Sequence, residues 1–378
     1  MQKWMTEFSE NEHAVYFASA DKAIRLVGFG CQTEISGWTD QRDLNAWVQQ
    51  QRTAVFGGFN FDADQELPGI MGGYFFTPNQ VIDLNEASDW GTTVVSTPKH
   101  PLQLLTETNE VDWTTRMQPV LETMQTDGTK QKVVLGMQTT LDFDASIDIA
   151  QLLESLVAQQ PNSYHFVMKS GETIFVSATP ERIVKLAGNQ FETAAVAGSI
   201  RRGDDEQADT VLADALWHDQ KNREEHQIVV NMLVKQLADI SKLTYAETPQ
   251  MLKTPQIQHL YTPIQGQLNA ETPLFALVER LHPTPALGGW PREWAKKVIE
   301  DYERAPRGLF AAPLGYYLPN GMGEFIVGIR SMLVEANQAR LFAGAGVLAE
   351  SDLAQEAQEI QLKMTPMREL LEDQIDAK

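Results

Sequence analysis

The chain has 378 residues, 43% of them apolar, which is enough to bury a sizeable core and excludes intrinsic disorder. Its formal net charge of −21 argues against nucleic acid and anionic membrane as partners, and its one cysteine, Cys31, excludes a disulfide framework and a cysteine-based zinc site. No run approaches the roughly 18 apolar residues of a membrane span, and the N-terminus lacks a signal-peptide pattern, so we expect a cytoplasmic protein.

The first half of the chain is rich in predicted strands. Residues 1–115 alternate short apolar runs with turns, as in AVYFA, IRLVGFG, AVFGGFNF and GGYFF, which predicts strands of an antiparallel sheet. A helix is predicted over about 113–126, a strand over 132–143 and an amphipathic helix over 147–160. Two hairpins follow, one turning at Gly171 and one at Gly188-Asn189.

The second half groups helices between strands. We predict a long helix over about 221–238 and helices near 274–281 and 292–304, the last begun by Pro291. Three strand-like runs follow at 308–317, 324–333 and 339–348, before a closing helix over about 353–373. This order indicates an α+β fold. With no Pro/Gly/Ser linker, we expect a single domain over 1–378, made of a less typical β-rich part (1–115) and a motif-bearing part (116–375).

Two predicted helices carry acidic groups in a regular spacing. Glu356, Glu359 and Lys363 share one helical face, and Glu225 lies one turn after Lys221. The ordinary interpretations are a solvated face and an i,i+4 ion pair. The alternative is a site for a hard cation such as Mg²⁺. The seven histidines form no HExxH motif and no close pair, so zinc is not expected.

A series of blocks occurs in order along the chain. The blocks are KVVLGMQTTL, ATPERIVKL, AVAGSIRRG, KNREEHQIVV, IQHL, LHPTPALGGWP, RGLFAAPLGYY, EFIVGIRS, LFAGAGV and ESDLAQEAQEIQLK. Together they resemble the chorismate-utilising enzymes, which include anthranilate, aminodeoxychorismate, salicylate and isochorismate synthases. The resemblance covers residues 120–375 well and 54–61 weakly, and it implies antiparallel sheets packed as a sandwich flanked by helices.

The block HPTPALGG discriminates within this family. It is similar to that of isochorismate synthases, whereas the ammonia-using synthases typically have a PxGTxSGxPK-like version. Salicylate-forming members also keep threonine where this chain has Ala286, so Ala286-Leu287 favours release of isochorismate. A helix end stopped by two prolines also accounts for part of the string.

The resemblance implies a reaction in which water attacks C2 of chorismate and the 4-hydroxyl leaves. It assigns the general base to Lys132 and the general acid to Glu181. A lysine acts as a base only when it is neutral, a form that burial or nearby positive charge favours. The acid requires the opposite adjustment, a carboxyl pKa raised towards neutrality, and one low-dielectric pocket provides both.

The resemblance also implies a Mg²⁺ cofactor, held by Glu225 and Glu359, with Glu356 binding through water or supporting these ligands. Lys363 is expected to face the ring carboxylate, and Arg330 to bind the enolpyruvyl carboxylate. His259 is expected to contact the substrate or a catalytic group, or to be a plain core histidine. The remaining substrate-binding residues implied are Gly198, Ser199, Ala286, Leu287, Phe310, Gly344 and Gly346, with Phe310 standing where tyrosine is frequent.

These expectations describe an isochorismate synthase that acts on chorismate as a monomer, without a glutaminase subunit, for menaquinone biosynthesis. The alternatives are a salicylate synthase, which goes on to eliminate pyruvate, and an isochorismate synthase of a siderophore pathway. A non-catalytic chorismate-binding protein would have no need of Lys132, Glu181, Glu225 and Glu359 together.

Overall fold

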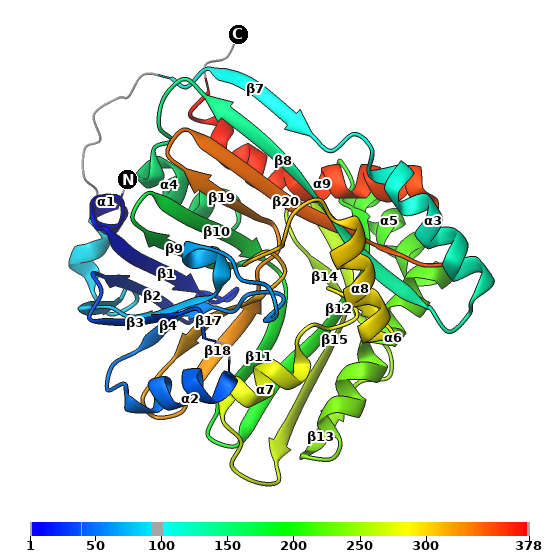
Figure 1. Ribbon diagram of the computed structural model, residues 1–378, viewed down its shortest axis with the longest axis horizontal. Helices are drawn as coiled ribbons and strands as arrows, with labels where there is room; N and C mark the ends of the chain where they lie inside the picture. The colour runs from blue at the N-terminus through cyan, green and yellow to red at the C-terminus, as the bar shows by residue number, and fades with distance from the viewer. Residues whose placement is uncertain (1, 39, 93–100, 376–378) are drawn as a thin grey trace.

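Two antiparallel sheets form the centre of the molecule. The structure is a computed structural model that describes residues 2–38, 40–92 and 101–375. Over these residues the first sheet has ten strands. Their spatial order (Figure 1) is β16 (Gly289–Trp290), β8 (Lys132–Phe143), β20 (Gln338–Val347), β19 (Ser331–Glu335), β10 (Thr173–Thr179), β9 (Tyr164–Ser170), β1 (His13–Ala18), β2 (Arg25–Phe29) and β6 (Gln80–Asp83), with β7 (Leu104–Asn109) beside β8.

The second sheet also has ten strands in the part of the chain that the structure describes. Their spatial order is β13 (Ser241–Tyr245), β15 (Ile257–Leu268), β12 (Gln190–Arg201), β11 (Arg182–Ala187), β18 (Gly323–Val327), β17 (Pro313–Tyr317), β4 (Val55–Gly58), β5 (Tyr74–Thr77) and β3 (Thr33–Ser36), with β14 (Gln250–Lys253) beside β15.

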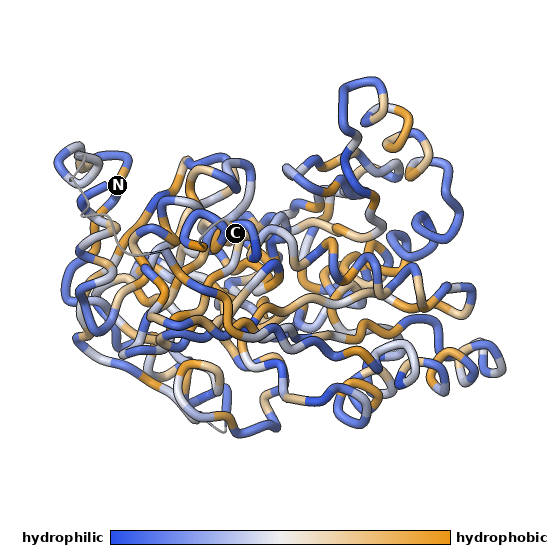
Figure 2. The backbone as a smooth tube through the Cα atoms, turned by 90° about the horizontal axis from the view of Figure 1, so that it is seen from above, coloured by the Kyte–Doolittle hydropathy of each residue, from blue (hydrophilic) through white to orange (hydrophobic). Residues whose placement is uncertain are grey.

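The inner faces of the sheets pack together into one continuous apolar core. Phe17 of the first sheet meets Tyr316 of the second edge to face, with ring centroids 4.8 Å apart. Hydrophobic segments accordingly run through the interior, while the loops at the periphery are largely hydrophilic (Figure 2). The predicted sandwich of antiparallel sheets in a single α+β domain is therefore confirmed.

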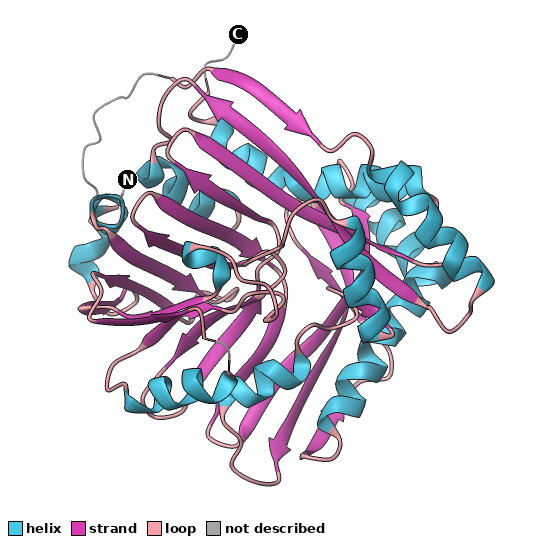
Figure 3. Cartoon of the chain, in the orientation of Figure 1, coloured by secondary structure: helices cyan, strands magenta, loops and turns pink. Residues whose placement is uncertain are grey.

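Helices flank the sandwich unevenly, with most of the helical mass gathered at one end of the molecule (Figure 3). That end contains α3, α5, α6, α8 and α9. The helices are α1 (Lys3–Glu10), α2 (Gln41–Gln50), α3 (Trp113–Thr126), α4 (Ile149–Gln159), α5 (Glu206–His218), α6 (Gln220–Leu237), α7 (Leu274–Leu281), α8 (Arg292–Tyr302) and α9 (Leu353–Glu372), with short 3-10 turns at η1 (Gly69–Gly72) and η2 (Ser88–Gly91). Over the described residues, none of the helices combines the length and the apolar character that crossing a membrane requires.

Two expectations about the strands were wrong. The run 324–333, predicted as one strand, is divided between β18 in the second sheet and β19 in the first, so the chain changes sheets between them. The N-terminal strands likewise do not form one sheet, because β1 and β2 belong to the first and β4 and β5 to the second. Apolar alternation predicts a half-buried strand but does not say which of two sheets the strand joins.

Candidate active site

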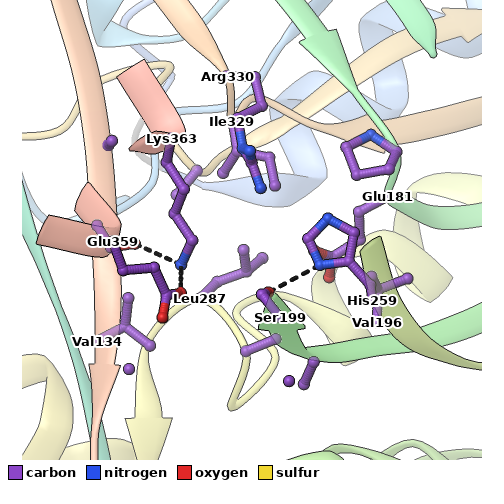
Figure 4. A pocket seen from close by; sticks show the side chains of 18 of the residues that line it. Val134, Glu181, Val196, Ser199, His259, Leu287, Ile329, Arg330, Glu359 and Lys363 are labelled. Carbon is purple, nitrogen blue, oxygen red and sulfur yellow. Dashed lines mark hydrogen bonds and ion pairs between the residues drawn. The ribbon is translucent and has the colours of Figure 1, made fainter. Parts of the chain in front are cut away.

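A cavity of about 730 Å³, partly open to solvent, lies where the two sheets and α9 meet (Figure 4). It brings together all ten residues predicted to bind substrate, along with Glu181, Glu225 and Glu359. In Figure 4, Glu359 and Lys363 lie across the cavity from Ser199, His259 and Glu181. The lining residues are Val134, Pro180, Glu181, Val196, Ala197, Gly198, Ser199, Glu225, His259, Ala286, Leu287, Arg307, Phe310, Ala311, Ile329, Arg330, Ala343, Gly344, Gly346, Glu359 and Lys363.

A bulge in β12 shapes one wall. The register between β12 and β15 shifts between Ala197 and Ser199, and Gly198 takes a φ of 78° that suits glycine. Ser199 then donates its backbone N–H to Asn222 Oδ1 at 3.1 Å. Its hydroxyl lies 2.8 Å from His259 Nδ1. Burial holds the pKa of His259 well below its usual value, so the imidazole is neutral at physiological pH.

Arg330 lies at the point where the chain passes from β18 to β19. Its backbone φ of 46° falls in the left-handed region, which a non-glycine residue adopts only under strong constraint. The side chain is buried, and burial lowers its pKa to about 10, against the opposing effects of Glu359 and Glu181. The guanidinium therefore stays charged at neutral pH. Arg330 lines the cavity, and no ion pair within 4.0 Å involves it among the described residues, so its guanidinium is suited to binding an anion there.

Lys132, predicted as the base, is fully buried and does not point into bulk solvent. Its Nζ lies 2.7 Å from Glu225 Oε1, behind the cavity wall rather than in the lining itself. Gly346 makes room for this pair, because a Cβ at that position would lie 2.8 Å from both Glu225 Oε1 and Lys132 Cε. Burial alone would raise the pKa of Glu225, but Lys132 and two further lysines outweigh it, so the pKa falls below its usual value.

Glu181, predicted as the acid, is also buried, with 5% of its surface exposed. Burial raises its pKa to about 8, although Lys132, Arg330 and Lys363 each act in the opposite direction. The carboxyl is therefore mostly protonated at neutral pH, as a proton donor must be.

Each carboxylate of the predicted metal site is paired with a lysine. Glu225 pairs with Lys132, Glu359 with Lys363 at 2.6 Å, and Glu356 with Lys221. Glu356, Glu359 and Lys363 lie on one helix, α9, as predicted. The interpretation of Lys221 and Glu225 as an i,i+4 ion pair is wrong, because Lys221 pairs with Glu356 and Glu225 pairs with Lys132. Lys221 links α6 to α9 instead, and all three carboxylates raise its pKa against the effect of burial.

This donor set fits a hard divalent cation. Glu225 and Glu359 both line the cavity, and Mg²⁺ needs only one or two carboxylates when substrate oxygens and water complete its shell. Glu356 does not line the cavity and is buried against Lys221, which suits a supporting role rather than a direct ligand. The three carboxylates do not form a ready-made cage of converging oxygens in the described residues.

Arg307 is a residue of the cavity that the sequence argument did not assign, although it opens the block RGLFAAPLGYY. Its guanidinium is buried, donates to Leu287 O at 2.7 Å and Val134 O at 2.8 Å, and stacks 4.3 Å from the Phe61 ring. Glu303 neutralises its charge. Arg307 thus ties the loop that presents Ala286 and Leu287 to strand β8. In the sequence Arg307 only follows Glu303 by four residues, a spacing that does not indicate this role.

The chain is similar in sequence and in fold to several known proteins. The chain is 43% identical, over 237 residues, to isochorismate synthase MenF of Bacillus subtilis, a match covering 62% of this chain and 50% of that protein. The chain therefore spans about half the length of that relative. Two solved structures each cover 97% of the chain. One is the menaquinone-specific isochorismate synthase MenF of Escherichia coli, which is 25% identical, is covered over 91% of its own chain and superimposes with a TM-score of 0.83. The other is a putative 2,3-dihydroxybenzoate-specific isochorismate synthase, DhbC of Bacillus anthracis, which is 27% identical, is covered over 98% of its own chain and superimposes with a TM-score of 0.85.

The family model for chorismate binding enzymes matches residues 80–372, which include the cavity and both carboxylate-bearing helices. Because that model matches well over half of the sequence, the chain belongs to the chorismate binding enzyme family.

Proposed function

We propose that this protein is an isochorismate synthase, which converts chorismate to isochorismate with Mg²⁺ as its cofactor. The observation that carries the proposal is a pair of buried groups: Glu181, which lines the cavity and is mostly protonated at neutral pH, and Lys132, which lies behind the cavity wall against Glu225. The pair matches a reaction in which one proton is given and one is taken.

In this reaction a water molecule forms a bond to C2 of the ring, and the bond between C4 and its hydroxyl oxygen breaks as the ring double bond shifts. Lys132 accepts a proton from the attacking water, and Glu181 delivers one to the leaving hydroxyl, which departs as water. Protons and oxygen atoms therefore balance, and the product is an isomer of the substrate. Arg330 and Lys363 supply the positive charge that the two substrate carboxylates require.

The Lys132 amine forms an ion pair with Glu225, one of the two proposed metal ligands. When bound by Glu225 and Glu359, Mg²⁺ would act as a Lewis acid towards the ring carboxylate and would compete with Lys132 for the charge of Glu225. Lys221 keeps Glu356 paired beside these ligands.

Product analysis tests the proposal. The protein is incubated with chorismate and Mg²⁺, the products are separated by chromatography, and pyruvate is measured. We expect isochorismate with little pyruvate, and loss of turnover when EDTA removes the metal. Salicylate and pyruvate in equal amounts would favour a salicylate synthase, and no turnover with water or any nitrogen source would favour a binding protein.

Ala286 and Leu287, which line the cavity, support release of isochorismate over pyruvate elimination. The route that uses the product is a finer question. We propose menaquinone biosynthesis, since the relatives reported above include MenF proteins of two bacteria, while the likeness to a 2,3-dihydroxybenzoate-specific enzyme keeps a siderophore route as the second candidate. Deleting the gene and measuring menaquinone separates the two.

A further inference from the structure

A second group of potential metal ligands lies far along the sheets from the cavity described above. In residues 2–38, 40–92 and 101–375, His13, Cys31 and Glu34 are the one group of three such side chains whose ligand atoms all lie within 4.8 Å of one another. His13 begins β1 in the first sheet, Glu34 lies in β3 at the edge of the second, and Cys31 is in the connection between β2 and β3.

The spacing of these atoms is close to that of a tetrahedral ion. Cys31 Sγ and Glu34 Oε2 are 3.7 Å apart. A zinc ion with a Zn–S distance of ~2.3 Å and a Zn–O distance of ~2.0 Å would hold its sulfur and oxygen ligands about 3.5 Å apart. A thiol, an imidazole and a carboxylate are also the three ligand types that zinc prefers, whereas Mg²⁺ and Ca²⁺ prefer oxygen alone.

Tyr74 contacts two of these three side chains. Its buried hydroxyl donates to Glu34 Oε2 at 2.5 Å and lies 3.3 Å from His13 Nδ1, so it orients two of the three potential ligands. Because its hydroxyl already contacts both side chains, Tyr74 is suited to be a supporting donor rather than a ligand. Glu34 itself is exposed, so an ion can reach the group from solvent.

We propose that His13, Cys31 and Glu34 bind a zinc-class divalent ion with water as the fourth ligand, independently of the chorismate site. The Cys31 thiol loses its proton to solvent as the sulfur–metal bond forms. The ion would link β1 of the first sheet to β3 of the second and stabilise the N-terminal edge of the sandwich. This proposal departs from the sequence analysis, which excluded zinc on the single cysteine and on the spacing of the histidines. The three ligands come from separate elements that only the fold brings together, and one cysteine suffices when a histidine and a glutamate complete the group.

The test titrates Co²⁺, a spectroscopic substitute for zinc, into the full-length protein with excess Mg²⁺ present to fill any hard-cation site. We expect one equivalent to give a thiolate-to-cobalt charge-transfer band in the near ultraviolet and the visible bands of tetrahedral cobalt, both removed by Zn²⁺. Cys31→Ser and His13→Gln should abolish these bands, and Tyr74→Phe should weaken binding by about 10- to 100-fold. His218→Gln, at an exposed histidine of α5, serves as the matched control.

Zinc should raise the Tm of the unaltered chain and of the His218→Gln control, but not that of Cys31→Ser. Chorismate turnover with Mg²⁺ should be the same in Cys31→Ser as in the parent, so a failure of the zinc site is distinguishable from a failure of the proposed function. Cobalt spectra without a thiolate band, or bands that persist at full strength in His13→Gln, would overturn the proposal.

Discussion

Lys132 Nζ lies 2.7 Å from Glu225 Oε1, which joins the candidate base directly to a candidate metal ligand. Lys132 is fully buried, the Glu225 side chain is 16% exposed at the cavity, and Gly346 provides the space in which they meet. A cation bound by Glu225 would therefore share this carboxylate with Lys132.

Replacing Lys132 is expected to lower both stability and turnover, and only the loss of stability should be recovered by a second substitution. Lys132→Met leaves the Glu225 carboxylate without its partner, which costs up to about 3 kcal/mol of unfolding free energy. Lys132→Met/Glu225→Gln should recover most of that loss in denaturant titrations, because no charge is left unpaired. Neither variant should form isochorismate. Near-normal turnover in Lys132→Met would remove this residue from the mechanism.

Gly346→Ala is expected to separate the same pair by steric contact. The added methyl group would lie 2.8 Å from Glu225 Oε1, so the side chains must move, and a displacement of about 1 Å can cost on the order of 100-fold in turnover. Gly128→Ala is the control, since a Cβ there meets nothing within 4 Å. Steady-state kinetics on both variants make the comparison, and equal rates would contradict the crowding argument.

Glu181 sets the expected pH dependence. Because burial raises its pKa to about 8 from an ordinary 4.5, the folded protein holds a proton that the unfolded chain has already lost between these values. Its contribution to stability is therefore full below pH 4.5 and declines as pH rises to about 8, by roughly 1.4 kcal/mol per pH unit.

The free energy of unfolding of Glu181→Gln should not show that decline. Denaturant titrations at several pH values would therefore show a difference in unfolding free energy between parent and variant that changes steadily with pH. Turnover by the parent should also fall above about pH 8, as the acid becomes ionised. Glu181→Gln should still bind chorismate but should not turn it over. A parallel pH dependence of stability in both proteins would mean that Glu181 does not titrate in this range.

Arg307 is expected to control the loop that carries Ala286 and Leu287. Arg307→Lys keeps a positive charge but cannot donate to Leu287 O and Val134 O together, so the loop should loosen. We expect kcat/KM to fall by at least about tenfold and the fraction of pyruvate to rise. Arg304→Lys, which alters an exposed arginine paired with Asp112, should do neither. An unchanged product ratio and rate in Arg307→Lys would contradict this role.

Much of the fold followed from the sequence because its elements have strong apolar patterns. The helices over α3 and α7 were predicted with the bounds observed, since each buries a clear apolar face. In contrast, α2 buries only Leu44 and Val48, and the edge strands β13 and β14 are mostly exposed, so these elements leave little periodic signal.

The sequence predicted which residues line the cavity, but not which of them form ion pairs with one another. Ordered sequence blocks indicated the residues of the cavity, yet pairs such as Lys132 with Glu225 or Lys221 with Glu356 join positions that are far apart in the chain. Arg307 escaped prediction for a related reason. The partners through which it holds the loop to β8 are backbone carbonyls, which every residue has, so the sequence cannot mark them.

The account's central claim is that Lys132 activates water for attack at C2 while Glu181 releases the 4-hydroxyl. It is tested most directly by running the reaction in water labelled with the heavy oxygen isotope and locating the label in the product by mass spectrometry and NMR. The claim predicts isochorismate with one labelled oxygen, at C2. Unlabelled isochorismate would mean that the hydroxyl migrates within the substrate, and would contradict it.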